Sequence, residues 1–443
     1  MALFGKKKTE GSLLISPLSG LALSINTAIG SGILALPLSF QQSGIILSSV
    51  IIYFFGVLMW TTCIQYLEIA CRYWHKTRPD HEYTLPEDDI VHLGASVLET
   101  PTTRAKSLIC YTLYQIGLIL MQFVTIMAYA NVSAGSMAQV VHFPMQDGDA
   151  CLNTSDLSKG CSHAYMIWVT VYIVINLVMS FIELKYQAIL QNLFALYRWV
   201  LIIVLIGMSS YALKHRGVSD SAIKYETTPA GFGSLLPTLT FAMYVHSGIS
   251  YLYQPVRNKN KSLNLMFFSL MMIVSVVFCL VACLNALAYG NSLSSVVTSS
   301  YLSDPLFTTK FEKGLIQLIN WYPPLALTFS SCNQAFPFAQ SLIEFAPKRY
   351  SNSFWLKISA RWIVIIIPSV IVYGVRSFTV LVSLSAFGGY LVCFFVPSLT
   401  LLLTADLKSA QSPYYKWYCQ PWYCYTIILW AIFSVIYTAI FFS

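Results

Sequence analysis

The chain has 443 residues, of which 56% are hydrophobic and 10% are charged, with a mean hydropathy of +0.65 and a net charge of +8. A soluble domain carries about 25% charged residues, and a globule this poor in charge would expose large apolar patches. The composition therefore excludes an ordinary soluble globule and predicts that lipid surrounds much of the surface.

About eleven apolar runs are long enough to cross a membrane as helices, which takes about 20 residues each. They are rich in Ile, Val, Leu and Phe and lack the strict alternation of a transmembrane barrel. The expected spans are 15–39, 44–72, 106–137, 164–182, 189–213, 231–252, 263–288, 313–341, 354–375, 377–404 and 423–443. The sequence therefore predicts an all-α polytopic membrane protein, with a short tail over 1–14 and a single transmembrane domain over 15–443.

Lys and Arg residues concentrate in the segments that would share a side of the membrane with the N-terminus. The positive-inside rule places that side in the cytoplasm. The net positive charge is thus explained by topology, and we expect no nucleic-acid partner. The first apolar run is too long for a cleavable signal peptide and lacks a small-residue cleavage site, so it should direct insertion itself.

The first span contains Asn26 one turn before Gly30-Ser31-Gly32. These residues are poor helix formers, so the span is predicted to unwind at this point. Unwound backbone survives in a membrane only where it is buried in protein or lines a watery cavity. Close helix packing through small residues is the alternative interpretation.

The loop between the third and fourth spans carries Cys151 and Cys161 on either side of an Asn153-Thr154-Ser155 sequon. The expected topology places this loop outside the cell or in a lumen, where disulfides persist. We therefore predict a Cys151–Cys161 disulfide, and the sequon makes Asn153 a candidate glycosylation site. The other cysteines lie in or near spans without His partners, so no zinc site or other metal site is predicted beyond a possible Na⁺ site.

The sixth span carries His246-Ser247-Gly248 near its middle, whereas the other six histidines fall in loops or at span edges. An ionisable residue at that depth in a membrane indicates function. The alternative is a neutral imidazole that is hydrogen-bonded for packing.

The two candidate interruptions fall in the first helix of each of two five-helix sets, 15–213 and 231–404, and 423–443 is an extra helix. Interrupted helices at corresponding positions of inverted repeats indicate a transporter site. A half-helix that begins at an interruption offers free N–H groups to a carboxylate, and one that ends there offers carbonyls to a cation. Together they suit a zwitterion such as an α-amino acid.

The stretch from Ser24 to Leu34 resembles the first-helix signature of the amino acid/auxin permease family, in the form found in sodium-coupled neutral amino acid transporters. The sixth span, with Phe241, Ala242 and His246, is similar to the phenylalanine-rich stretch of that family, although Ser247-Gly248 stands where Pro often follows the His. The resemblance implies a leucine-transporter-type fold with a broken first and a broken sixth helix.

Residue by residue, the resemblance assigns the substrate carboxylate to the amides of Gly30, Ser31 and Gly32. It assigns the rest of the substrate pocket to Tyr244, Val245, His246 and Ser247. A coupling cation would bind the carbonyls of Asn26 and Ile29, with the Asn26 side chain nearby. Its remaining ligands would be three hydroxyls of the eighth span, namely those of Thr328, Ser330 and Ser331. These hydroxyls could instead bond to backbone one turn back.

Other polar residues within the spans are less specific. Glu68 and Arg361 lie close to helix ends, where snorkelling to the membrane surface is expected. Arg198 lies deeper and could pair with a carboxylate as a gate. Gln122 and Thr125, near the middle of the third span, are candidates for pocket lining.

The pattern favours a secondary amino acid transporter, a symporter that works by alternating access and is driven by Na⁺ or H⁺. No nucleotide-binding loop, catalytic constellation or cofactor motif is apparent, so an enzyme is not expected. An amino-acid-binding nutrient sensor is the alternative function. The expected location is the plasma membrane or a lysosomal or vacuolar membrane.

Overall fold

A computed structural model describes residues 16–77, 104–141, 143, 151, 157–182, 184–223, 225–249, 256, 259–344, 353–405 and 412–441 of the chain. Of the described residues, 84% are helical, and none forms a β-strand. The predicted class, an all-α polytopic membrane protein, is confirmed.

The helices fall into two groups along the chain, over residues 17–216 and 229–440. The first group comprises α1 (Pro17–Ala28), α2 (Gly32–Ser43), α3 (Ile45–Thr77), α5 (Arg104–Val140), α6 (Lys159–Met179) and α7 (Leu184–Arg216). The second group comprises α8 (Pro229–Ala242), η2 (His246–Gly248), α10 (Lys259–Tyr289), η3 (Gly290–Ser292), α11 (Val297–Leu302), α12 (Lys310–Tyr322), η4 (Pro323–Leu327), α13 (Thr328–Glu344), α14 (Phe354–Ile371), α15 (Phe378–Tyr390), η5 (Leu391–Phe395), α16 (Val396–Leu403), η7 (Trp417–Cys419) and α17 (Pro421–Ile440).

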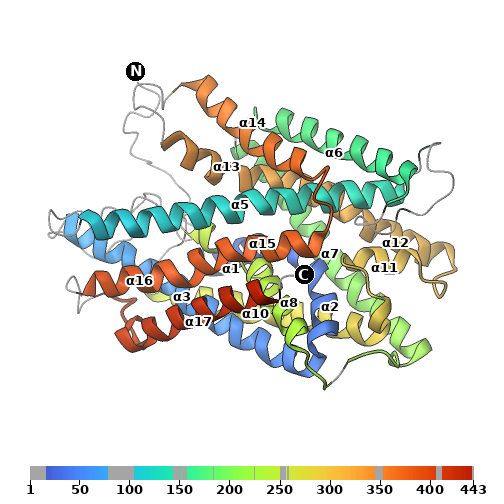
Figure 1. Cartoon of the computed structure of the whole chain (residues 1–443), viewed down its shortest axis with the longest axis horizontal. Helices are drawn as coiled ribbons and strands as arrows, with labels where there is room; N and C mark the ends of the chain where they lie inside the picture. The colour runs from blue at the N-terminus through green and yellow to red at the C-terminus, as the bar shows by residue number, and fades with distance from the viewer. Residues whose placement is uncertain are drawn as a thin grey trace.

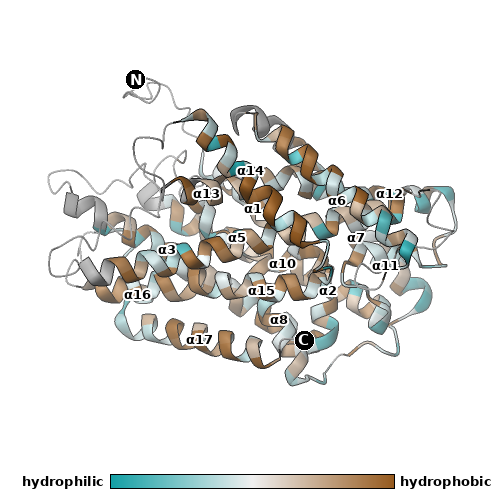
Figure 2. Cartoon of the chain, turned by 45° about the horizontal axis from the view of Figure 1, so that its top comes forward, coloured by the Kyte–Doolittle hydropathy of each residue, from teal (hydrophilic) through white to brown (hydrophobic). Residues whose placement is uncertain are grey.

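Within the part of the chain that the structure describes, eight helical segments are long and apolar enough to cross a membrane. They lie at 45–72, 108–140, 159–179, 193–216, 262–292, 354–371, 378–403 and 421–440. The other three predicted spans coincide with the interrupted helices α1/α2, α8/η2 and α12/η4/α13. Eleven crossings thus remain a prediction. Large apolar side chains on the outer helices face outwards, as Leu265, Leu429 and Ile440 do, and Figure 2 shows hydrophobic residues along α1, α14 and α17.

Both interruptions that the sequence predicts are present in the structure. Helix α1 ends at Ala28, and the amide of Gly30 bonds to the carbonyl of Ala28, two residues back, before α2 starts at Gly32. Helix α8 ends at Ala242, and a 3₁₀ turn follows from His246. Regular i to i−4 bonding therefore fails at two places within the apolar body.

The eighth predicted span is interrupted in a milder way. Helices α12 and α13 are joined by a π-helical segment, η4, that begins with Pro323-Pro324. Proline lacks an amide donor and disturbs the helical ladder, which accounts for the irregular turn at this point. The chain direction nevertheless continues into α13, so this span is deformed and not unwound.

Helix α5 is the central element of the molecule, and Figure 1 shows it running along much of its length. Helix α15 packs along α5, and α8 packs against both α15 and α2. Helix α3 packs against α10, which also contacts α1 and α2. The two interrupted helices α1/α2 and α8/η2 are thus brought side by side within the bundle.

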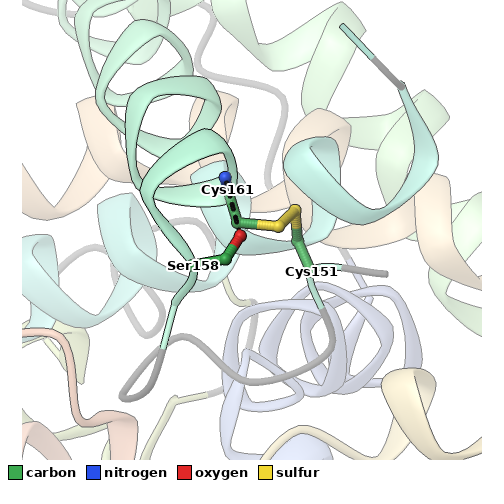
Figure 3. The surroundings of a disulfide bond; sticks show 3 residues. All are labelled: Cys151, Ser158 and Cys161. Carbon is green, nitrogen blue, oxygen red and sulfur yellow. Dashed lines mark hydrogen bonds between the residues drawn. A yellow bond between two sulfur atoms is a disulfide. The ribbon is translucent and has the colours of Figure 1, made fainter. Parts of the chain in front are cut away.

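The predicted disulfide between Cys151 and Cys161 is present, with the two Cα atoms 5.5 Å apart (Figure 3). Ser158 caps the start of α6 by accepting a hydrogen bond from the amide of Cys161 at 3.4 Å. Both cysteines are buried against Ala138 at the end of α5 and Ala164 of α6. The bond therefore fastens the loop to the two helices that it joins, while Asn153 lies outside the described residues.

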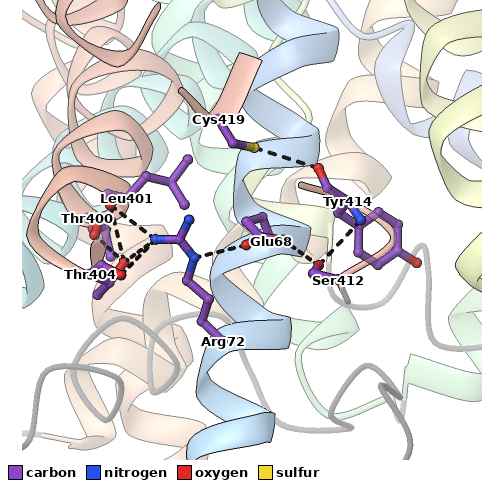
Figure 4. Close-up of polar contacts among 8 residues, drawn as sticks. All are labelled: Glu68, Arg72, Thr400, Leu401, Thr404, Ser412, Tyr414 and Cys419. Carbon is purple, nitrogen blue, oxygen red and sulfur yellow. Dashed lines mark hydrogen bonds and ion pairs between the residues drawn. The ribbon is translucent and has the colours of Figure 1, made fainter. Parts of the chain in front are cut away.

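A buried ion pair corrects the prediction made for Glu68. Its carboxylate accepts a hydrogen bond from Arg72 Nε at 2.9 Å, and the Glu68 and Arg72 side chains are only 0% and 1% exposed. Arg72 also donates to the carbonyl oxygens of Leu401 and Thr404 at the end of α16, and Ser412 donates to Glu68 (Figure 4). Snorkelling is therefore wrong for Glu68, because the end of α16 and the segment at Ser412 cover its side chain and that of Arg72.

Candidate functional site

The two interruptions lie in direct contact. A Cβ atom placed on Gly32 would come within 2.3 Å of the Ala242 Cα atom, which is far inside van der Waals contact. The first residue of α2 thus abuts the last residue of α8, and only a residue without a side chain allows this approach. The structure brings together the two predicted parts of the substrate site.

The start of α2 is a buried helix N-terminus. Ser31 precedes it and is 1% exposed, but its side chain makes no capping hydrogen bond to the helix. The Ser31 hydroxyl has no hydrogen-bond partner among the described residues. A helix N-terminus carries partial positive charge and free amides, so this end of the site is suited to an anion such as a carboxylate.

Tyr129 of α5 adds a hydroxyl to this end of the site. It lies 3.2 Å from the position that a Cβ atom on Gly30 would occupy, and its side chain is 5% exposed. The sequence analysis did not select Tyr129. Its spacing of seven residues from Gln122, which places both on one helix face, was the available signal.

His246 begins the 3₁₀ turn that follows the end of α8, and it is 1% exposed. Its Nε2 atom lies 2.9 Å from the hydroxyl of Thr62 and 3.6 Å from the Cys63 sulfur, both on α3. The rings of Tyr66 and Tyr244 lie 5.8 and 6.3 Å away between centroids. No described residue forms a hydrogen bond with His246 Nδ1.

Gln122 and Ser247 connect α5 to the sixth-span interruption. The Gln122 side-chain amide donates to the Ser247 hydroxyl at 3.2 Å, and its Oε1 atom has no partner in the described part of the chain. Val245 is 2% exposed beside them. Thr125, by contrast, donates to the carbonyl of Met121 in its own helix at 2.7 Å. Gln122 therefore faces the interruption, as its predicted role as pocket lining requires.

The predicted cation ligands lie on helices that have different main packing partners. Helix α1 packs on α10, whereas α13 packs against α5, α6 and α14. Ile29 is 1% exposed, and the Asn26 side chain lies outside what the structure describes.

Of the three hydroxyls on the eighth span, Thr328 and Ser331 are buried and Ser330 is half-buried. Ser331 donates to the carbonyl of Leu327 at 2.8 Å and also pairs with the Tyr172 hydroxyl. Its bond to backbone one turn back matches the alternative interpretation of these hydroxyls. The cation site stays a prediction.

The two remaining arginines within spans have neutral partners. Arg198 is 7% exposed, and its Nε atom donates to the Tyr322 hydroxyl at 3.2 Å. Arg361 donates to the carbonyl of Ser180, at the end of α6, at 2.8 Å and stacks over Phe336. No described carboxylate pairs with Arg198, so the structure offers no ion pair for the predicted gate.

Comparison with known protein families shows the class to which the chain belongs. The model of the transmembrane amino acid transporter protein family matches residues 14–441, nearly the whole chain. The chain therefore belongs to the transmembrane amino acid transporter family, and it is a multi-pass integral membrane protein.

A curated relative is the transmembrane protein 104 homolog of Caenorhabditis elegans. It is 26% identical over 258 residues, which cover 54% of this chain and 51% of the relative. The matched region thus spans about half the length of that relative.

Proposed function

We propose that this protein is a secondary transporter that moves amino acids across a membrane by alternating access. The observation that carries the proposal is the contact between Gly32 and Ala242, which joins two interrupted helices at one buried point. Membership of the transmembrane amino acid transporter family supports the same substrate class.

The two ends of the site differ in polarity, which matches a zwitterion. The free amides at the start of α2, together with the Tyr129 hydroxyl, supply donors for a carboxylate. At the sixth-span interruption, His246 Nδ1 and Gln122 Oε1 are buried without described partners. An amino acid bound between them would satisfy polar groups that are costly to leave buried and unpaired.

Alternating access would follow from movement of the interrupted helices relative to the rest of the bundle. In transporters with such helices, rigid groups rock around a fixed midplane site. Here α5 would form the stationary wall, because it contacts both interruptions through Gln122 and Tyr129. Bound substrate would shift the equilibrium between the outward-facing and inward-facing states only as far as its affinities for the two states differ.

Coupling to an ion gradient is part of the proposal, and Na⁺ is the favoured ion. The hydroxyls of Thr328 and Ser330 are hard oxygen ligands of the kind that such a cation prefers. His246 is the group that would instead relay protons. The membrane in question is the plasma membrane or that of an acidic organelle.

Uptake by purified protein in liposomes tests the function. Labelled amino acids would be supplied as a panel under an inward Na⁺ gradient, with choline replacing Na⁺ at fixed pH and with an imposed pH gradient as separate arms. We expect saturable uptake of at least one amino acid under the Na⁺ gradient. Replacement of Na⁺ by choline should abolish this uptake. Uptake that choline leaves undiminished would reject sodium coupling, and tight binding without any flux would indicate a nutrient sensor.

A further inference from the structure

The two nitrogens of His246 have very different surroundings. Nε2 lies 2.9 Å from the hydroxyl oxygen of Thr62, whereas Nδ1 is buried with no hydrogen-bond partner among the described residues. In a neutral imidazole one nitrogen carries the proton and the other accepts hydrogen bonds. The hydrogen bonds that the two ring nitrogens make with their neighbours determine which nitrogen carries the proton.

The hydroxyl of Thr62 decides this choice. Its oxygen lies 3.1 Å from the carbonyl oxygen of Leu58 and 3.2 Å from that of Met59, one turn back along α3. Either carbonyl oxygen can accept the single hydroxyl proton of Thr62, in the back-bonding usual for threonine in helices. The Thr62 oxygen then has a lone pair, and no proton, to offer His246.

Two other neighbours of the ring, Tyr66 and Cys63, are compatible with this assignment. The Tyr66 hydroxyl donates to the carbonyl of Val392 at 2.7 Å, so its proton is directed away from the imidazole. The Cys63 thiol lies farther from the same nitrogen, at 3.6 Å, and is only a weak donor, so the closer Thr62 oxygen is the stronger partner. Nε2 therefore carries the proton, and Nδ1 is a bare acceptor.

We propose that Thr62 is a positioning residue that holds His246 in its Nε2-protonated form, so that Nδ1 receives a hydrogen bond from the ammonium group of the transported amino acid. This inference rests on the proposed function. It assigns the ammonium to the α8/η2 side of the site, opposite the amides of α2. It also makes the site selective for ligands that carry an amino group.

A comparison of two ligands tests the selectivity. The affinity of purified protein would be measured for an amino acid found in the uptake panel and for the same carboxylic acid without its amino group. In Thr62→Val the acceptor for Nε2–H is removed at nearly constant volume. We expect the affinity for the amino acid to fall about tenfold, as for a hydrogen bond to a charged group, while that for the desamino acid stays within about twofold.

Two further variants separate positioning from general damage. Thr62→Ser keeps the hydroxyl and should retain the affinity of the wild type for both ligands. Thr61→Val makes the same chemical change one residue away, where the hydroxyl pairs with Tyr423 at 2.7 Å and does not contact His246. It should leave the ratio of the two affinities unchanged. An equal loss for both ligands in Thr62→Val would overturn the inference.

A second measurement does not depend on how Thr62→Val folds. Solid-state NMR of protein labelled with ¹⁵N-histidine reports which ring nitrogen is protonated, and the spectrum of His246→Gln identifies the signal. We expect an unprotonated Nδ1 in the ligand-free wild type, and a protonated Nδ1 would refute the assignment. If the wild type bound no amino acid at all, the proposed function itself would be refuted. If Thr62→Val bound both ligands with the wild-type ratio of affinities, only the inference about Thr62 would be refuted.

Discussion

Glycine 32 shows how a single residue determines the geometry of the site. Because a Cβ atom at this position would lie 2.3 Å from the Ala242 Cα atom, an alanine would force α2 and α8 apart. Overpacking of this kind costs up to about 3 kcal/mol even where side chains can move, and here the obstacle is backbone. An alanine at this position should therefore lower the stability of the protein and disrupt the geometry of the substrate site.

We predict that Gly32→Ala lowers the melting temperature of the purified protein and abolishes amino acid uptake. Gly207→Ala is the matched control, since a Cβ atom at Gly207 in α7 would meet no atom within 4 Å. The control should melt at or slightly above the wild-type temperature, because alanine favours the helix by about 1 kcal/mol over glycine. Normal uptake by Gly32→Ala would refute the importance of this contact.

Tyr129 is the second residue whose role can be isolated. If its hydroxyl donates to the substrate carboxylate beside Gly30, Tyr129→Phe removes one hydrogen bond to a charged group and little volume. We predict an increase in KM of about tenfold, with the melting temperature of the ligand-free protein nearly unchanged. A variant with wild-type KM would show that the carboxylate binds elsewhere.

The sequence predicts the backbone of the site better than its walls. Poor helix formers at Gly30 and Gly32, and a deep histidine at position 246, mark both interruptions without any knowledge of the fold. Tyr129 and Thr62 carry no such mark, because a tyrosine or threonine within an apolar helix is ordinary. Their roles depend on which helices become neighbours, and this is set by packing between segments far apart in the chain.

The same limit appears at the level of whole elements. Glu68 and Arg72 are four residues apart on α3, a spacing that places them on one helix face, so their pairing was available from the sequence. Their burial was not, since it comes from the end of α16 and from the segment at Ser412. The exact place where the first and sixth helices stop and restart likewise depends on the fold, since α2 begins against the end of α8.

The ion pair between Glu68 and Arg72 within α3 gives a prediction about stability. Removal of one partner leaves a buried charge without compensation, which costs about 3–5 kcal/mol. We expect Glu68→Ala to destabilise the protein by this amount in denaturant or thermal unfolding. The double variant Glu68→Ala/Arg72→Met should lose less than the sum of the two single losses, and strictly additive losses would show that the two side chains do not stabilise each other.

At the scale of the whole molecule, the disulfide and the basic residues mark opposite sides of the membrane. Cys151 follows the C-terminal end of α5 and Cys161 lies in the first turn of α6, whereas Arg72 lies near the C-terminal end of α3, before the start of α5 in the chain. The positive-inside rule assigns the Arg72 end to the cytoplasm, so the disulfide should face the exterior or a lumen.

Thiol labelling of the protein in sealed vesicles of known orientation tests this topology. A membrane-impermeant reductant followed by an impermeant maleimide should label Cys151 and Cys161 when the exterior or luminal face is outward. Replacement of both cysteines by serine should remove that labelling. Labelling only in vesicles of the opposite orientation would invert the assigned topology.

A map of the protein bound to its substrate, obtained by electron cryo-microscopy in a lipid nanodisc, tests the central claim most directly. The account predicts density for an amino acid between the first amides of α2 and the imidazole of His246, with the carboxylate towards Gly32. Ligand density at another place in the bundle, or regular helix running through residues 29–31 and 243–245 in the bound protein, would contradict it.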